Sequence, residues 1–103
     1  MTETELQDAV LEIAHLFGWH TLHIRPARTN SGWRTAVSGD GKGWPDCVLV
    51  KDRVLYRELK VGNGSLSPSQ REWGEWLQLA GCDYGVWRDT DWKDGTIERE
   101  LRT

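Results

Sequence analysis

Two short motifs carry the residue types that could do chemistry in this chain. They are Pro45-Asp46 and, twelve residues beyond Asp46, Glu58-Leu59-Lys60. Two apolar runs joined by a polar triplet lie between them, which predicts a β-hairpin. Asp46 would then stand at the start of one strand, with Glu58 and Lys60 at the end of the other. Two carboxylates and a lysine converging at one corner suit a divalent-metal site that cleaves phosphodiester bonds.

Side chains alternate along the second strand, so Tyr56, Glu58 and Lys60 share one face of the predicted sheet. If Asp46 joins that face, its carboxylate and that of Glu58 repel each other unless a cation lies between them. Oxygen ligands with no His or Cys nearby in the sequence favour Mg²⁺ or Mn²⁺ over Zn²⁺. Lys60 would orient or deprotonate an attacking water, or stabilise charge developing on the phosphate. The alternative is a surface salt bridge among Asp46, Glu58 and Lys60.

The hairpin register decides whether Asp46 reaches that face. A three-residue loop at 51–53 pairs Val50 with Val54 and sets Asp46 opposite Glu58. A two-residue loop would shift the register by one residue and turn Asp46 to the other face. We therefore predict an odd-numbered loop or a bulge.

Two helices are expected to flank the hairpin. The first spans residues 3–17 as an amphipathic helix with a capping box at its start and Gly18 at its end. Glu3 lies in line with the apolar stripe of this helix, so we expect it to point toward the body of the protein. The alternative is a first-turn acid stabilised by the helix dipole.

The second helix begins after the cap residue Ser67, with Gln70 completing a capping box. Gly74 inside this helix costs about 1 kcal/mol relative to Ala, which suggests a close approach by another backbone. The apolar face of this helix is expected at Trp73, Trp76, Leu77 and Ala80. A further strand is expected over residues 83–88, and a short terminal helix over residues 97–101.

A strand over residues 19–25 precedes a long loop over residues 26–45. A loop of this length inside a small domain usually has a functional reason. The basic side chains of this region are candidates for DNA contact: Arg25, Arg28, Arg34 and Lys42. The alternative is a tolerated insertion. Of the seven tryptophans, Trp33 and Trp92 lie in or near loops and could stack on bases, whereas the others are assigned to the core or its edge.

The composition sets limits on the protein class. The chain of 103 residues is expected to form one domain, residues 1–103. No apolar run approaches the ~20 residues of a membrane span, and the acidic N-terminus does not resemble a signal peptide. Cys47 and Cys82 match no zinc or redox spacing, so we expect buried thiols in a reducing cytoplasm. The net charge is −3, but residues 20–60 hold eight bases against four acids, which is compatible with phosphate binding.

Taken together, these motifs resemble the PD-(D/E)xK nuclease superfamily and, within it, the small phage-type and repair nucleases of the VRR-NUC family. The resemblance covers nearly the whole chain in the expected order. It is carried by the leading helix with Glu3, Leu6 and Gln7, by Gly43-Trp44-Pro45-Asp46, by Glu58-Leu59-Lys60, by residues 66–73, and by Gly81 followed by Val86-Trp87-Arg88.

This resemblance implies a restriction-endonuclease-like α/β domain with an α-β-β-β-α-β core, a mixed central sheet and flanking helices. It implies Mg²⁺- or Mn²⁺-dependent cleavage of DNA, with Asp46, Glu58 and the Leu59 carbonyl as metal ligands and Lys60 as the catalytic lysine. Glu3, or Glu5 beside it, would be the acid of the first helix, and Gln70 a second-helix residue near the site. Stand-alone members resemble Holliday-junction resolvases and act as homodimers in a bacterial or phage-infected cell.

Two alternatives to the nuclease stay open. The first is a DNA-binding module that keeps the nuclease fold without catalysis, against which the intact Asp46, Glu58 and Lys60 argue. The second is a protein-interaction domain, which the many tryptophans favour. An exposed apolar surface without a basic groove would support the second alternative.

Overall fold

The fold is described from a computed structural model, which places the backbone of residues 1–24, 27–29, 32–34 and 40–103 and the side chains of residues 1–24 and 40–103. The first helix, α1 (Glu3–Leu16), begins as predicted. The Thr2 hydroxyl accepts a hydrogen bond from the Glu5 amide at 3.1 Å, and the Glu5 carboxylate accepts one from the Thr2 amide at 2.9 Å. Gly18 follows the helix with a positive φ of 87°, the conformation that ends helices with glycine.

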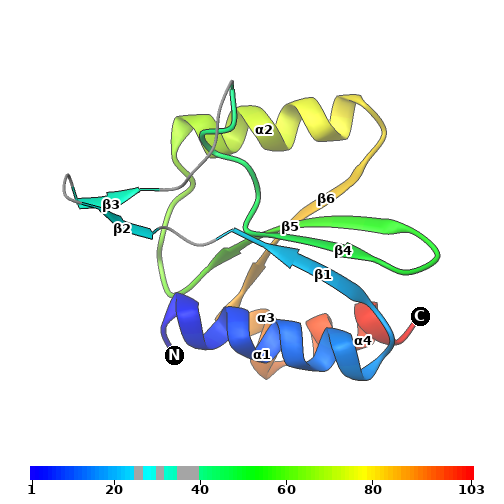
Figure 1. Ribbon diagram of the computed structural model, residues 1–103. Coiled ribbons are helices and arrows are strands. Elements are labelled where there is room, and N and C mark those ends of the chain that lie inside the picture. The colour runs from blue at the N-terminus through cyan, green and yellow to red at the C-terminus, as the bar shows by residue number, and fades with distance from the viewer. Residues whose placement is uncertain (25–26, 30–31, 35–39) are drawn as a thin grey trace.

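A four-stranded mixed sheet forms the centre of the protein (Figure 1), with strand order β1-β4-β5-β6. The first three of these strands pair antiparallel, whereas β5 and β6 pair parallel through a crossover that contains α2. The strands are β1 (His20–His23), β4 (Cys47–Val50), β5 (Val54–Lys60) and β6 (Asp83–Arg88). The chain is therefore an α/β protein, and its principal elements follow the expected order α-β-β-β-α-β.

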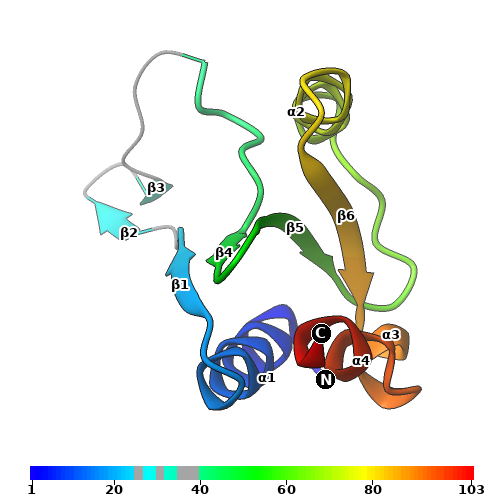
Figure 2. The ribbon, with the colours of Figure 1, turned by 90° about the vertical axis from the view of Figure 1, so that its right-hand side faces the viewer.

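The sheet separates the helices into two layers (Figure 2). One face is covered by α1 together with α3 (Asp89–Lys93) and α4 (Thr96–Arg102), and the other face by α2 (Pro68–Leu79). The core lies on the α1 and α4 side, because most of the fully buried apolar side chains come from these helices and the strand residues that face them. They are Leu6, Val10, Ala14, Trp19, Cys47, Leu49, Leu55, Leu59, Trp87, Ile97 and Leu101.

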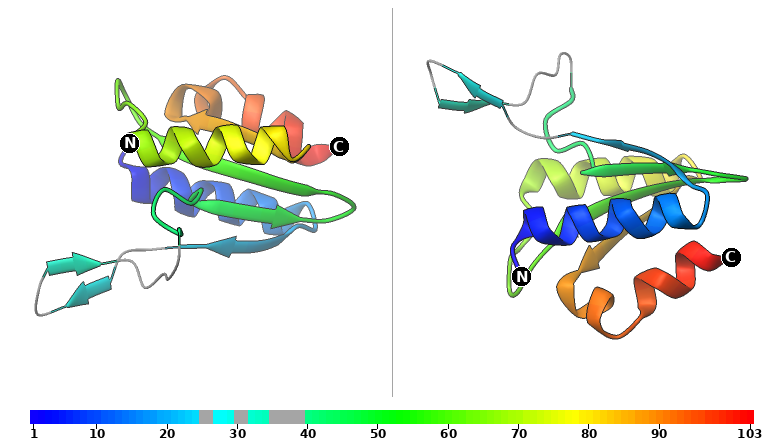
Figure 3. Two further views of the ribbon diagram at one scale, coloured as in Figure 1. Left: turned by 90° about the horizontal axis from the view of Figure 1, so that it is seen from above. Right: turned by 60° about the horizontal axis from the view of Figure 1, so that its bottom comes forward.

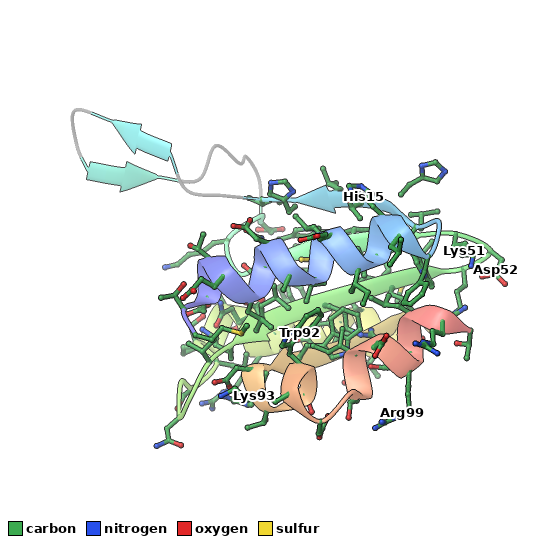
Figure 4. The ribbon with its side chains drawn as sticks, turned by 90° about the horizontal axis from the view of Figure 1, so that it is seen from below. His15, Lys51, Asp52, Trp92, Lys93 and Arg99 are labelled. Atoms are coloured by element: carbon green, nitrogen blue, oxygen red, sulfur yellow. The ribbon has the colours of Figure 1, made fainter. Side chains whose placement is uncertain are left out.

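The C-terminal region differs from the expectation by one helix. A terminal helix was expected over residues 97–101 and is present as α4, but α3 was not anticipated. Trp92 lies in α3 rather than in a loop, and it packs against the core between α1 and the C-terminal helices (Figure 4). Its five-residue helix is too short to show a periodic apolar pattern in the sequence.

Arg57 connects the strands to the C-terminal helix, a role that the sequence analysis did not anticipate. Its side chain points to the core face and is 3% exposed. The guanidinium donates to the Asp83 carboxylate at 2.8 Å and to the Glu100 carboxylate at 3.4 Å, and it lies 5.1 Å from the centre of the Trp87 ring. Burying this charge is possible because two carboxylates and an aromatic face surround it.

Helix α2 begins with the predicted capping box, in which Ser67 and Gln70 satisfy each other's backbone amides. Its expected apolar face is only partly buried, since Leu77 is buried whereas Trp76 is 46% exposed and Ala80 is exposed. The assignment of Trp76 to the core edge was therefore wrong. Helix α2 packs on β6 near the edge of the sheet, so one narrow stripe is enough to cover it.

Gly74 provides the close contact between α2 and the sheet. A Cβ atom at this position would lie 2.6 Å from Cε1 and 2.8 Å from Cζ of Tyr84, which is closer than real Cβ atoms come. The expected approach is therefore present, but the neighbour is an aromatic side chain on β6 and not another backbone. The sequence shows that a glycine is needed there and does not show which residue needs the space.

Gly74→Ala is therefore expected to destabilise the protein by about 1–3 kcal/mol, the usual effect of overpacking. In an unhindered helix the same change would stabilise by about 1 kcal/mol. Urea unfolding midpoints measure the difference. In a Tyr84→Ala background the steric conflict is absent, so Gly74→Ala should become neutral or stabilising. An equal loss in both backgrounds would contradict this account.

The segment expected as a long loop contains a small hairpin. Strands β2 (Ala27–Thr29) and β3 (Gly32–Arg34) pair antiparallel, with Arg28 opposite Trp33, and form a second sheet outside the main one (Figure 3). The prediction of a loop over residues 26–45 was thus wrong in part. Three-residue strands rich in Arg, Thr and Gly lack the apolar alternation by which strands are recognised.

Cys47 is buried as expected, whereas Cys82 is only half-buried, and neither takes part in a disulfide. Among the helices in the described part of the chain, none combines the length and the apolar character needed to cross a membrane.

Candidate functional site

The hairpin has the register on which the candidate site depends. Val50 pairs with Val54 across the three residues 51–53, and Cys47 pairs with Arg57. The predicted odd-numbered loop is confirmed. Because each step along one antiparallel strand is matched by one step on its partner, Asp46 falls opposite Glu58.

The two strands part at this point. The pairing between β4 and β5 ends at Cys47, whereas β5 continues to Lys60 along β6 only. The Asp46 side chain replaces the backbone hydrogen bond that β4 no longer provides, since its Oδ2 accepts a hydrogen bond from the Leu59 amide at 2.9 Å. The parting of β4 and β5 therefore leaves a corner in which the side chain of Asp46 is fixed beside the backbone of β5.

Glu58 occupies the centre of this corner and is 1% exposed. Its Oε1 accepts a hydrogen bond from Nε2 of Gln70 at 3.1 Å, and the Gln70 Oε1 accepts one from the Ser67 amide at 2.8 Å. Gln70 thus performs both functions considered for it, capping α2 and contacting the site. The second carboxylate oxygen of Glu58, Oε2, is buried, and apart from the Asp46 carboxyl group it has no hydrogen-bond partner in the described part of the chain.

The surroundings of Glu58 raise its pKa to about 9. Desolvation by burial is the largest cause, followed by a hydrogen bond with Asp46, which needs a proton on one of the two carboxyl groups, and by the negative charge of Asp46. The charge of Lys60 lowers the pKa of Glu58, and that of Glu3 raises it. Three charged groups, from α1, the β4 end and β5, therefore act on Glu58 at this corner.

The charge of Glu3 acts on the site although its side chain is not buried there. The residue is exposed in the first turn of α1, so the expectation that it points into the body of the protein is not met. The buried stripe of α1 starts one turn later, at Leu6. Glu5 is occupied by the capping box with Thr2. Of the two acids considered, Glu3 is the one whose charge acts on Glu58.

Lys60 ends β5 and pairs with Arg88 of β6. It shares the face of Glu58, as the alternation predicted, and it is half-buried. Arg88 is held elsewhere, because its guanidinium donates to the backbone carbonyls of Gly62 and Gly64. Lys60 is therefore the basic residue that the strand register places beside the two carboxylates.

The segment leading to Asp46 is fixed against α2. Trp44 makes edge-to-face contacts with Tyr56 and Trp73, at centroid distances of 5.8 and 4.9 Å. The indole N–H of Trp73 donates to the Asp40 carbonyl at 2.8 Å. Gly43 has a φ of 89°, and a Cβ atom there would overlap the backbone of Ser69 and Gln70.

Gly43→Ala should therefore both destabilise the protein, by about 1–3 kcal/mol, and displace the segment that ends at Asp46. If the corner binds Mn²⁺, the affinity for this ion should fall as well, measured by isothermal titration calorimetry. Gly81→Ala is the control, since Gly81 has a similar φ of 83° with no atom within 4 Å of the added Cβ. It should reproduce the strain but keep the Mn²⁺ affinity; equal effects at both positions would argue against a role for the Gly43 contact.

The basic side chains proposed for DNA contact are only partly placed. Lys42 is exposed on the segment before Asp46. Arg25 lies outside the described residues, as do the side chains of Arg28 and Arg34, whose backbones belong to β2 and β3. The other bases of the basic segment do not all gather at the site. Arg53 binds the C-terminal residue Thr103, Arg57 is buried, and Lys51 lies in the loop at the far end of the hairpin (Figure 4).

In the described residues, no group of three or more His, Cys, Asp or Glu side chains is arranged to hold a metal ion. The possible metal ligands at the corner are the carboxylates of Asp46 and Glu58 and the Leu59 carbonyl. Gln70 is not among them, because its Nε2 donates to Glu58 and its Oε1 accepts from the Ser67 amide. The three ligands and Gln70 were all candidates from the sequence, whereas the position of Tyr84, which lies opposite Tyr56 on the same face of the sheet, was not anticipated. Comparisons of the chain with protein-family models and with curated protein sequences found no match.

Proposed function

We propose that the protein is a metal-dependent endodeoxyribonuclease with a restriction-endonuclease-like fold. The observation that carries the proposal is the placement of Asp46 opposite Glu58 where β4 and β5 part, with Lys60 on the same face. The order of the principal elements and the mixed sheet are compatible with the core that the VRR-NUC resemblance implies.

The donor set fits a hard divalent cation. Its atoms are oxygens, and when both carboxylates are ionised the buried Oε2 of Glu58 lacks the partner that a buried carboxylate oxygen normally has. The raised pKa of Glu58 reflects burial beside a second carboxylate, the condition that a cation between them would relieve. Asp46, Glu58 and the Leu59 carbonyl would hold Mg²⁺ or Mn²⁺. Such an ion supplies Lewis-acid polarisation of a phosphoryl oxygen and a more acidic water.

The remaining residues are assigned by position. Lys60 would orient the attacking water, accept its proton, or stabilise charge on the phosphate oxygens. Gln70 fixes the Glu58 carboxylate from α2, and the charge of Glu3 contributes negative potential from α1. The backbone amide of Leu59 holds the Asp46 carboxylate in place.

The substrate and assembly follow from the resemblance. Stand-alone VRR-NUC proteins resemble Holliday-junction resolvases, so branched DNA is the proposed substrate and a homodimer the proposed assembly. A symmetric dimer would present two sites to two strands, as the cutting of a four-way junction requires.

Cleavage of end-labelled DNA tests the proposal. A four-way junction, a flap and a linear duplex of the same sequence are incubated with Mg²⁺, with Mn²⁺ or with EDTA. We expect metal-dependent cutting, strongest on the branched substrates, and its loss in Lys60→Ala. The absence of cutting on all three substrates would exclude the nuclease, and binding without cutting would favour the DNA-binding module.

A further inference from the structure

Tyr84 lies on the same face of the sheet as the candidate site. It pairs with Tyr56 in the parallel register of β5 and β6, and Tyr56 is two residues from Glu58 on one strand. Side chains two residues apart on a strand share a face, so the Tyr84 ring is a diagonal neighbour of Glu58. Helix α2 covers both. Gly74 rests on the Tyr84 ring, and Gln70, one turn earlier on the same side of the helix, binds Glu58.

The hydroxyl of Tyr84 is buried without a hydrogen-bond partner. In the described part of the chain only three buried side-chain atoms share this condition, namely Arg57 Nε, Glu58 Oε2 and the Tyr84 hydroxyl. Two of the three are therefore found under α2, beside the site. Leaving a buried polar group unsatisfied is costly, and a bound water or ion is one of the features that explain such atoms.

The two atoms are complementary in chemistry. The Glu58 oxygen accepts hydrogen bonds or binds a cation, whereas the Tyr84 hydroxyl can donate one. Desolvation raises the pKa of Tyr84, and the charges of Glu58 and Asp46 raise it further. The phenol therefore keeps its proton, and both carboxylates lie near enough to act on it.

We propose that the Tyr84 hydroxyl is a further binding group of the site, donating a hydrogen bond to an oxygen atom of a water or phosphate group held at Asp46 and Glu58. The inference rests on the proposed metal site, and it assigns to β6 a residue that touches the bound ligand. The shared chemistry is an oxygen acceptor, and the water and the phosphate are separated by experiment.

Tyr84→Phe tests this assignment, because it removes the hydroxyl and keeps the ring that supports Gly74. The metal-free protein should be as stable as the wild type or more stable in urea, since the lost group has no partner there. Mn²⁺ affinity measured by calorimetry probes the water. Affinity for a labelled four-way junction, measured by fluorescence anisotropy with Ca²⁺ replacing Mg²⁺, probes the phosphate. A neutral hydrogen bond predicts a loss of roughly three- to tenfold in at least one of the two.

Tyr56→Phe is the matched control. Tyr56 is the neighbouring tyrosine on the same face, and its hydroxyl is not among the buried atoms without a partner. It should leave both affinities unchanged.

The outcomes separate the two ligands and the two proposals. A loss of Mn²⁺ affinity assigns the hydroxyl to a water, and a loss of junction affinity alone assigns it to a phosphate. Unchanged affinities, or reduced stability of metal-free Tyr84→Phe, would overturn the inference. A wild-type protein that does not bind Mn²⁺ would also overturn it. The calorimetric comparison needs no DNA, so failure of the wild type to cut DNA counts against the nuclease and not against this contact.

Discussion

Lys60→Ala is expected to lower metal-dependent DNA cleavage by about 10²-fold or more, the usual loss when a group that stabilises developing charge or transfers a proton is removed. The same change should leave Mn²⁺ affinity unchanged or slightly higher. Lys60 is a cation beside Asp46 and Glu58, and its charge lowers the pKa of Glu58, so its removal makes the corner more negative. Calorimetry and a single-turnover cleavage assay measure the two effects separately.

Asp46→Asn, in contrast, should weaken metal binding as well as cleavage. The asparagine oxygen can still accept the hydrogen bond from the Leu59 amide, so the local backbone is kept while one negative charge is lost. Mn²⁺ affinity and cleavage should fall together. Lys51→Ala, at the other end of the hairpin, is the control and should change neither. Loss of Mn²⁺ affinity in Lys60→Ala would contradict the separate roles, and full activity in Lys60→Ala would remove the role of the lysine alone.

The stability of the metal-free protein should decrease as the pH rises from about 4.5 to about 9. The pKa of Glu58 is raised from 4.5 in the unfolded chain to about 9 in the folded protein. Below pH 4.5 both states hold the proton, so the folded state carries no penalty. Between the two values the unfolded chain releases the proton more readily, and stability falls by at most about 1.4 kcal/mol per pH unit. Urea unfolding at pH 5, 6, 7 and 8 in EDTA measures this slope.

Glu58→Gln isolates the effect, because glutamine keeps an oxygen for the Gln70 amide and cannot ionise. The difference in slope between wild type and Glu58→Gln belongs to Glu58, whatever the histidines contribute. Saturating Mg²⁺ should flatten the wild-type profile, since a cation stabilises the charged carboxylate that higher pH produces. Identical slopes in the two proteins would show that Glu58 is ionised normally in the folded state.

Local sequence patterns determined the parts of this protein that depend on near neighbours. Capping boxes defined the starts of α1 and α2, because their hydrogen bonds join residues only three apart. The three-residue loop determined the hairpin register and with it the pairing of Asp46 and Glu58, because strand side chains alternate with a period of two. The short strands β2 and β3 and the helix α3 were missed, because three to five residues do not display a period.

The tertiary structure decided what depends on distant segments. The placement of α2 over the sheet brings Gln70 to Glu58 and Gly74 to Tyr84, and no local pattern encodes these contacts. The same packing excludes water from Glu58 and so raises its pKa, whereas Glu3, equally acidic in the sequence, stays exposed. The sequence alone thus supplied the two carboxylates and a prediction of their register, which the structure confirmed. Only the packing of α2 against β5 and β6 determined how deeply the site is buried and which other side chains line it.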